Sequence, residues 1–116
     1  MIKVTQRRVD QVVVVDLGGR IVLGDGSATL RDAIHDLLAA NETRILLNLA
    51  EVSYIDSSGL GELIAGFTAV RARGGELKLL HLTRKVHDLL QITKLYTVFD
   101  IKDDEATAIA SFSPLP

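Results

Sequence analysis

The chain has 116 residues, of which 47% are hydrophobic and 4% are aromatic, and its formal net charge is −2. This length suits one domain with an aliphatic core, and the scattered basic residues form no stripe that would bind nucleic acid. The absence of cysteine excludes a disulfide framework and a thiolate metal site. The sequence has no secretory signal and no apolar run near the roughly 18 residues that span a bilayer. We therefore expect a cytoplasmic protein with no membrane partner and no direct contact with nucleic acid.

The beginning of the chain predicts antiparallel strands joined by short turns. Residues 3–8 and 12–15 have the composition of strands, and a polar turn at residues 10–11 separates them. Two glycines at 18–19 then precede a further apolar stretch at 21–23.

Residues 27–40 predict an amphipathic helix, with Asp25 or Ser27 as its N-cap. Its apolar residues recur at the spacing of one helix face: Leu30, Ala33, Ile34, Leu37 and Leu38. The nearly continuous apolar run at 44–49 is typical of a strand that is covered on both faces, so we place it at the centre of the sheet.

A second amphipathic helix is predicted from about Ser57 to Arg73, and Gly74 and Gly75 end it. The residues of its apolar stripe are Leu60, Leu63, Ile64, Phe67 and Val70. These positions share one side of the helix, so we expect them to face the sheet.

The last third of the chain continues the alternation of strands and helices. Residues 76–82 predict a strand, Thr83 can cap a short helix, a short strand lies near 98–101, and a helix spans 105–112. The alternation implies parallel pairing with helical crossovers. We therefore expect one α/β domain over residues 1–116, with a mixed, mainly parallel sheet of about four or five strands, about four covering helices and a frayed tail at 113–116.

Residues 54–61, YIDSSGLG, place two hydroxyl groups and two glycines where a strand meets a helix. A nucleophile elbow needs Gly-x-Ser-x-Gly, and neither Ser57 nor Ser58 has a glycine two positions earlier. A catalytic base is also missing from the pattern, because His35 falls within a predicted helix and His81 at the end of a predicted strand. We therefore expect a protein that is not an enzyme.

Nucleotide and metal sites are also not indicated. Residues 24–27, GDGS, lack the lysine of a Walker loop and the third glycine of a dinucleotide fingerprint, so we interpret them as a turn before a helix. The three histidines show no metal-ligand spacing. We expect no cofactor and no metal.

The start of the second helix could accommodate a phosphate group. Either Asp56 or Ser57 can cap this helix, whose free N–H groups and positive dipole end favour a negative charge. Phosphorylation of Ser57 would add about −1.5 to −2 charges. Beside Asp56, such a charge would alter the docking face of the domain without unfolding it.

A row of small residues, Gly61, Ala65 and Ala69, runs along the same helix at intervals of four. Such a row permits close approach, either by another element of the same domain or by a partner at an exposed surface. Gly59 and Gly61 each lower helix propensity by up to about 1 kcal/mol relative to alanine. A site that needs close approach to the backbone would explain both glycines.

Residues 52–61, VSYIDSSGLG, together with residues 71–75, RARGG, resemble the STAS domains, and among them the anti-sigma factor antagonists, also called anti-anti-sigma factors. The resemblance covers nearly the whole chain. The Asp-Ser-Ser-Gly-Leu-Gly motif at a strand-to-helix junction is its most specific part.

The resemblance implies that Ser57, directly after the motif aspartate, is a phosphoacceptor. It also implies an anti-sigma factor that is a serine kinase: the unphosphorylated protein binds it and frees a sigma factor, phosphorylation weakens that binding, and a serine phosphatase reverses the change. We expect a monomer or a weak dimer. The expected partner-binding residues are Asp56, Ser58, Gly59, Leu60, Gly61 and Ala65.

Two departures from the family pattern stand out. Arg20 and Val22 occupy positions where the family commonly has acidic residues, and Lys94 follows Thr93 where it often has glycine. STAS domains also occur as non-phosphorylated subunits or scaffolds of transporters and sensory complexes, which is the alternative function. In that case Ser57 would serve only as a helix cap.

Overall fold

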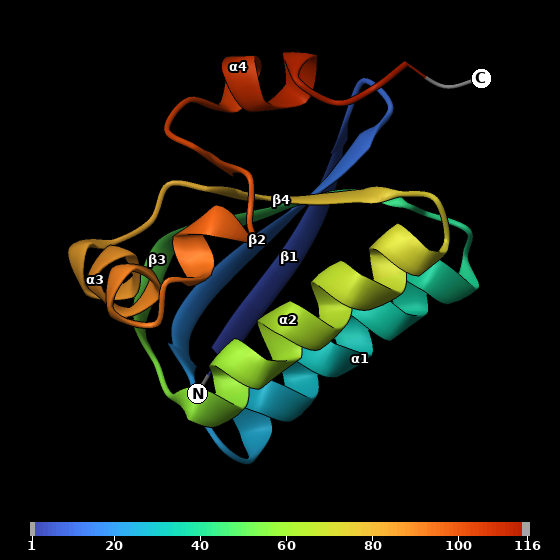
Figure 1. Ribbon diagram of the computed structural model, residues 1–116. Coiled ribbons are helices and arrows are strands. Elements are labelled where there is room, and N and C mark those ends of the chain that lie inside the picture. The colour runs from blue at the N-terminus through green and yellow to red at the C-terminus, as the bar shows by residue number, and fades with distance from the viewer. Residues whose placement is uncertain (1, 115–116) are drawn as a thin grey trace.

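The sheet of the computed structural model, which describes residues 2–114, contains five strands in the order β1-β2-β3-β4-β5 (Figure 1). β1 (Ile2–Val9) is antiparallel to β2 (Val12–Ile21), whereas β3 (Arg44–Ile55), β4 (Glu76–Leu80) and β5 (Ile101–Lys102) extend the sheet in parallel. The predicted mixed, mainly parallel sheet is confirmed, and β3 is central. It continues to Ile55, beyond the predicted end at residue 49.

Helices cover both faces of the sheet, as expected for an α/β domain. α1 (Asp25–Ala39), α2 (Ser57–Ala72) and α3 (Arg84–Ile92) lie on one face, and α4 (Glu105–Ala110) lies on the other (Figure 1). A short 3-10 helix, η1 (Leu95–Thr97), connects α3 toward β5. The four predicted helices are confirmed.

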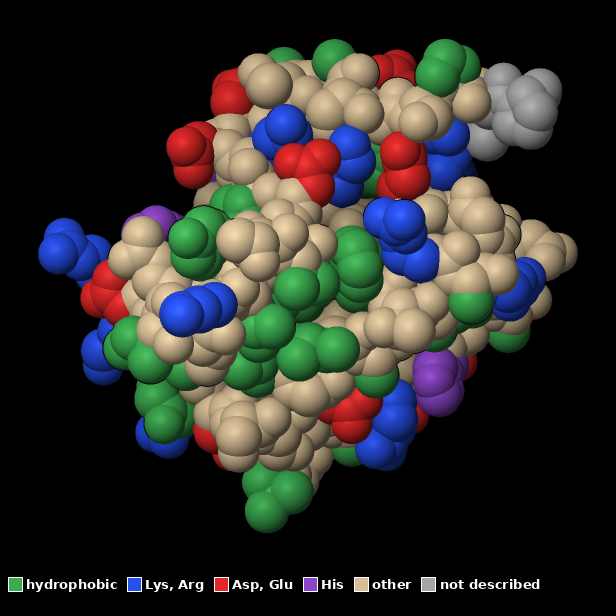
Figure 2. Space-filling view, in the orientation of Figure 1, with side chains coloured by type: hydrophobic (Ala, Val, Ile, Leu, Met, Phe, Trp, Pro, Cys, Tyr) green, Lys and Arg blue, Asp and Glu red, His purple; other side chains and the backbone are tan. Residues whose placement is uncertain are grey.

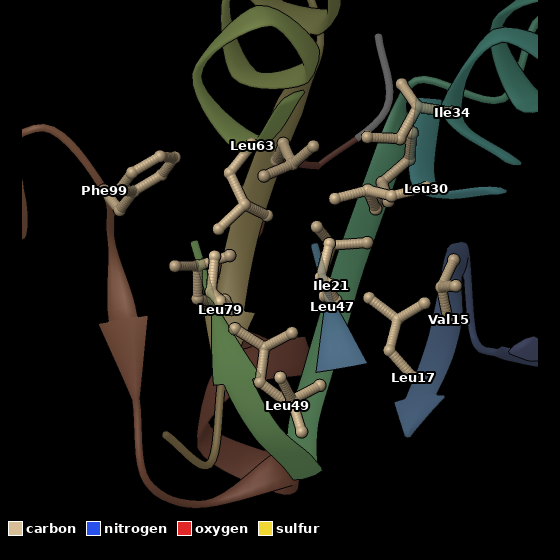
Figure 3. Close-up of a cluster of buried hydrophobic side chains, with 14 of the residues drawn as sticks. Val15, Leu17, Ile21, Leu30, Ile34, Leu47, Leu49, Leu63, Leu79 and Phe99 are labelled. Atoms are coloured by element: carbon tan, nitrogen blue, oxygen red, sulfur yellow. The ribbon is translucent and has the colours of Figure 1, made fainter. Parts of the chain in front are cut away.

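Each face of the sheet has its own apolar cluster because successive side chains of a strand point to opposite sides. Val15 and Leu47 belong to the larger cluster, beneath α1, α2 and α3 (Figure 3). Val14 and Leu46, one residue earlier in each strand, belong to the smaller cluster, where Phe112 covers them after α4. The run of valines in β2 therefore supplies both cores.

The structure corrects the interpretation of Gly18 and Gly19 as a break between strands. β2 continues through both glycines, with irregular register against β3 between Asp16 and Gly18 and between Gly19 and Arg20. A Cβ atom on Gly18 would lie 3.3 Å from the Cβ of Glu51. Glycine marks an irregular strand as readily as a turn, so the sequence pattern did not separate the two cases.

The start of α1 and the position of β5 also differ from expectation. Gly24 occupies the N-cap of α1 without a side-chain hydrogen bond, so the prediction of a cap by Asp25 or Ser27 was wrong. The strand predicted near 98–101 is displaced: β5 starts at Ile101.

The tail is held at its first residue. The backbone N–H and the hydroxyl group of Ser113 both donate to the Glu76 carboxylate, at 2.9 Å. Fraying therefore does not begin at Ser113, and residues 115–116 of the predicted tail lie outside the described residues.

Lys94 ends α3 in the left-handed conformation, with φ 61°. A side chain is strained there, whereas glycine is not. We expect Lys94→Gly to raise the free energy of unfolding by up to about 1 kcal/mol in urea unfolding. As a control, Lys85→Gly, inside α3, should lower it by about 1 kcal/mol. If both variants lost the same free energy of unfolding, the left-handed conformation of Lys94 would not be a source of strain.

Candidate functional site

The motif of residues 54–61 joins the end of β3 to the start of α2, next to the end of β2. A Cβ atom on Gly59 would overlap the carbonyl oxygen of Ile21, and one on Gly26 would overlap that of Arg20. The first turns of α1 and α2 therefore lie directly against the backbone of β2. The candidate site consists of the first turn of α2 and the loop at residues 22–24.

Asp56 links these two parts. Its Oδ1 atom accepts a hydrogen bond from the N–H of Gly59 at 2.9 Å, which caps α2, and its Oδ2 atom accepts one from the N–H of Leu23 at 3.0 Å. The N–H groups of Gly59 and Leu23 stabilise the carboxylate and lower the pKa of Asp56 below its ordinary value. Of the two caps that the sequence allowed, the structure selects Asp56.

The two serines of the motif differ in their surroundings. The hydroxyl group of Ser58 is hydrogen-bonded to that of Ser27 at 2.9 Å, and Ser27 in turn donates to the carbonyl group of Val22 at 3.0 Å. Ser57 is exposed, and no hydrogen bond joins its hydroxyl group to any of residues 2–114. Ser58 thus helps to hold α1 against α2, whereas the hydroxyl group of Ser57 is accessible.

Gly59 and Leu60 contribute to packing. Gly59 is buried against Ile21, and the side chain of Leu60 is in the larger core cluster with the residue only 8% exposed. The side chain of Leu60 therefore packs in the core rather than facing a partner. The prediction that Gly59 and Leu60 bind a partner stays a prediction, and in this structure both residues have a packing role.

The row of small residues on α2 is open to solvent at its start. Gly61 and Ala65 are exposed, and a Cβ atom on Gly61 would meet nothing within 4 Å. Ala69 is half-buried, and the close contact between α1 and α2 is made instead by Gly66 against Ile34. Of the two alternatives for this row, the geometry favours an exposed surface at Gly61 and Ala65.

Arg20, one of the departures from the family pattern, lies over the ring of Tyr54 at 5.3 Å. Both residues are exposed, and they are partners in the register of β2 and β3. A guanidinium group on an aromatic face is an attractive cation–π arrangement. Beside the first turn of α2, this chain therefore presents a basic and aromatic surface.

The sequence pattern does not mark Leu23 as part of the site, and it indicates Ser27 only as a cap. Leu23 is 80% exposed, and its backbone N–H is held by Asp56. No sequence signal marks that contact because the two residues are far apart in the chain. Ser27 could have been considered as a link between helices only once its position beside Ser58 was known.

The described part of the chain contains no cluster of three or more histidine, cysteine, aspartate or glutamate residues that could hold a metal ion. Among residues 2–114, neither Ser57 nor Ser58 is hydrogen-bonded to a histidine. In the same range no helix has the length and apolar character needed to cross a membrane.

The family model of the STAS domain matches residues 3–108 of this chain. The chain belongs to the STAS domain family. The match extends from β1 into α4, so it includes all five strands except for the first residue of β1, and it includes the candidate site.

Relatives of this STAS domain include proteins named anti-sigma factor antagonists. That of sigma-B from Listeria monocytogenes is 41% identical over 59 residues, which are 51% of this chain and 52% of the relative. The chain spans about half the length of curated relatives such as this one. An anti-sigma factor antagonist from Mycobacterium paratuberculosis has a similar fold, with a TM-score of 0.82 and 20% identity over 97% of this chain and 94% of that one. The fold is also similar to that of the Bacillus cell fate determinant SpoIIAA in its phosphorylated form. The TM-score is 0.72, and the sequences are 23% identical over 93% of this chain and 97% of that one.

The carboxylate of Asp56 should make stability depend on pH. Because its pKa is lower in the folded than in the unfolded chain, where it is near 3.9, its contribution is complete above about pH 5 and is lost as the pH falls through the folded-state pKa. We expect the stability difference between the wild type and Asp56→Asn to shrink between about pH 5 and pH 2.5, measured by urea unfolding. Asp103→Asn, which removes a carboxylate at an exposed residue, is the control for the loss of one negative charge. A constant difference for Asp56→Asn would contradict the role of the charge.

Proposed function

We propose that this STAS domain is an anti-sigma factor antagonist that acts by partner switching. The unphosphorylated form binds an anti-sigma factor that is also a serine kinase and so releases a sigma factor. Phosphorylation of Ser57 weakens this binding, and a serine phosphatase restores it. The names of the curated relatives support the partner class, and a structural neighbour that exists in a phosphorylated form supports the modification.

The exposed hydroxyl group of Ser57 at the first position of α2 is the observation that carries the proposal. Ser58, the neighbouring candidate, is half-buried and hydrogen-bonded to Ser27. A kinase could reach Ser57 without disturbing the contact between α1 and α2, whereas access to Ser58 would require that contact to break.

The charge of a phosphate group explains how the modification could act without unfolding the domain. Asp56 already uses the N–H groups of Gly59 and Leu23, so a phosphate on Ser57 would find few free donors and would lie beside a carboxylate. The added −1.5 to −2 charges would then concentrate negative potential on the exposed surface. Each 1.4 kcal/mol of unfavourable interaction with a partner weakens binding about tenfold.

Incubation with the anti-sigma factor kinase encoded by the same genome and ATP would test the site of modification. We expect one phosphate in the intact mass of the wild type and of Ser58→Ala, and none for Ser57→Ala. Modification of Ser57→Ala would disprove the assignment. An unmodified wild type that still binds its partner would favour a constitutive scaffold.

Binding measurements with the same kinase would test the switch itself. Ser57→Ala should bind like the wild type, whereas Ser57→Asp should bind at least about tenfold more weakly because it places a second negative charge beside Asp56. Circular dichroism would establish that both variants are folded. Equal affinity of the two variants would contradict the switch.

A further inference from the structure

A groove of about 300 Å³ lies between the end of β3 and α3. It forms because β3 extends beyond the end of β4, the neighbouring strand. The last pair between β3 and β4 joins Asn48 to Leu80, yet β3 continues to Ile55. α3 covers this extension only in part, at the point where the Thr83 hydroxyl group donates to the Val52 carbonyl group at 2.9 Å. The groove beside it is lined by Tyr54, Ile55, Lys85, Asp88, Leu89 and Ile92.

Two large apolar side chains at this groove are exposed. Ile92, at the end of α3, is 80% exposed, and Tyr54, at the end of β3, is 43% exposed. Leu89, which is half-buried, also lines the groove. Figure 2 shows hydrophobic side chains together with basic, acidic and histidine side chains over the part of the surface formed by α3. Grouped apolar side chains next to a depression are typical of protein-binding surfaces, where one inserted side chain can dominate the affinity.

The lining of the groove has one basic and one acidic residue, and two further basic residues lie beside it, although the whole chain has a net charge of −2. Arg20 lies over the Tyr54 ring, and Lys85 lines the groove. Asp88 is the acidic residue of the lining, and Arg84 lies 3.8 Å from its carboxylate. The surplus of basic groups favours a partner segment with acidic residues.

We propose that this groove is a second docking surface, which receives a large apolar side chain from an acidic segment of the protein partner. The proposal rests on the proposed function, since the partner is the anti-sigma factor kinase. Tyr54 precedes Asp56 by two residues, so a partner seated at Ser57 can reach the groove along the end of β3. The groove binds the partner in both states of the protein, whereas the phosphate on Ser57, in the first turn of α2, weakens the binding.

The affinity of the kinase for the groove variants Ile92→Ala and Lys85→Glu would test this surface, with Val98→Ala and Lys3→Glu as matched controls. Val98 is an exposed apolar residue outside the lining, and Lys3 is an exposed basic residue on β1. We expect each groove variant to bind about tenfold more weakly and each control to bind like the wild type. Added salt should weaken the wild type more than Lys85→Glu, because that variant has lost part of the attraction.

The outcomes separate the two proposals. Weaker binding confined to the groove variants, with unchanged unfolding temperatures, would support the docking surface. Wild-type affinity in Ile92→Ala and Lys85→Glu would overturn the groove while leaving the switch at Ser57 in place. A wild-type protein that does not bind the kinase at all would overturn both.

Discussion

Gly59→Ala is expected to lose about 2–3 kcal/mol of its free energy of unfolding. The added methyl group would overlap the carbonyl oxygen of Ile21, which is part of the β2 backbone and cannot rotate away. Overpacking of this kind costs about 1–3 kcal/mol, and a backbone obstacle places the cost in the upper part of that range. The small gain in helix propensity does not offset it, because the first turn of α2 would have to shift. Urea unfolding monitored by circular dichroism would measure the loss.

Gly61→Ala is the matched control, two residues further along the same helix turn. A Cβ atom at this position meets nothing within 4 Å, so stability should stay unchanged or rise by up to about 1 kcal/mol. If the two variants lost equal stability, the contact between Gly59 and β2 would not be the cause. Because Gly61 is exposed, Gly61→Ala also gives a folded protein in which a methyl group has been added to the proposed partner surface.

Lys78→Met is expected to lose about 2–3 kcal/mol and to loosen α4. Lys78 is only 7% exposed, and its Nζ atom donates to the carbonyl and hydroxyl oxygens of Ser111, both at 2.9 Å, and lies 3.0 Å from Asp100. It also lies 4.9 Å from the centre of the Phe112 ring. Methionine retains the apolar stem but leaves these acceptors without their charged donor, and hydrogen bonds to charged groups contribute about 1.5–3 kcal/mol.

Hydrogen exchange would locate the effect of Lys78→Met. Amide protons of α4 should exchange faster than in the wild type, while those of α2 should change only with global stability. Lys102→Met is the control: Lys102 pairs with the half-exposed Asp100 at 3.3 Å, and the loss of such a pair costs at most about 1 kcal/mol. If both variants lost the same free energy of unfolding, the burial of Lys78 would not make its interactions more stabilising than the exposed pair of Lys102.

Local signals in the sequence were sufficient for the helices and for one of the caps. The stripes that contain Leu30 and Leu63 follow from helical spacing alone, and both residues are fully buried. Asp56 caps α2 because the acceptor and its donor, Gly59, are three residues apart. Ser27 failed as a cap because its hydroxyl group bonds Val22 and Ser58 instead, and that competition depends on residues outside its own helix.

The sequence by itself determined that two serines and two glycines lie where the central strand meets the second helix, since strand and helix periodicity meet there. Only the tertiary structure decided how they differ. Ser58 is bound by Ser27 and Gly59 is pressed against Ile21, while Ser57 and Gly61 remain exposed. These contacts are with α1 and β2, tens of residues earlier in the chain. A hydrogen bond or a van der Waals contact depends on which atoms the fold brings together, and the spacing within the motif carries no information about them.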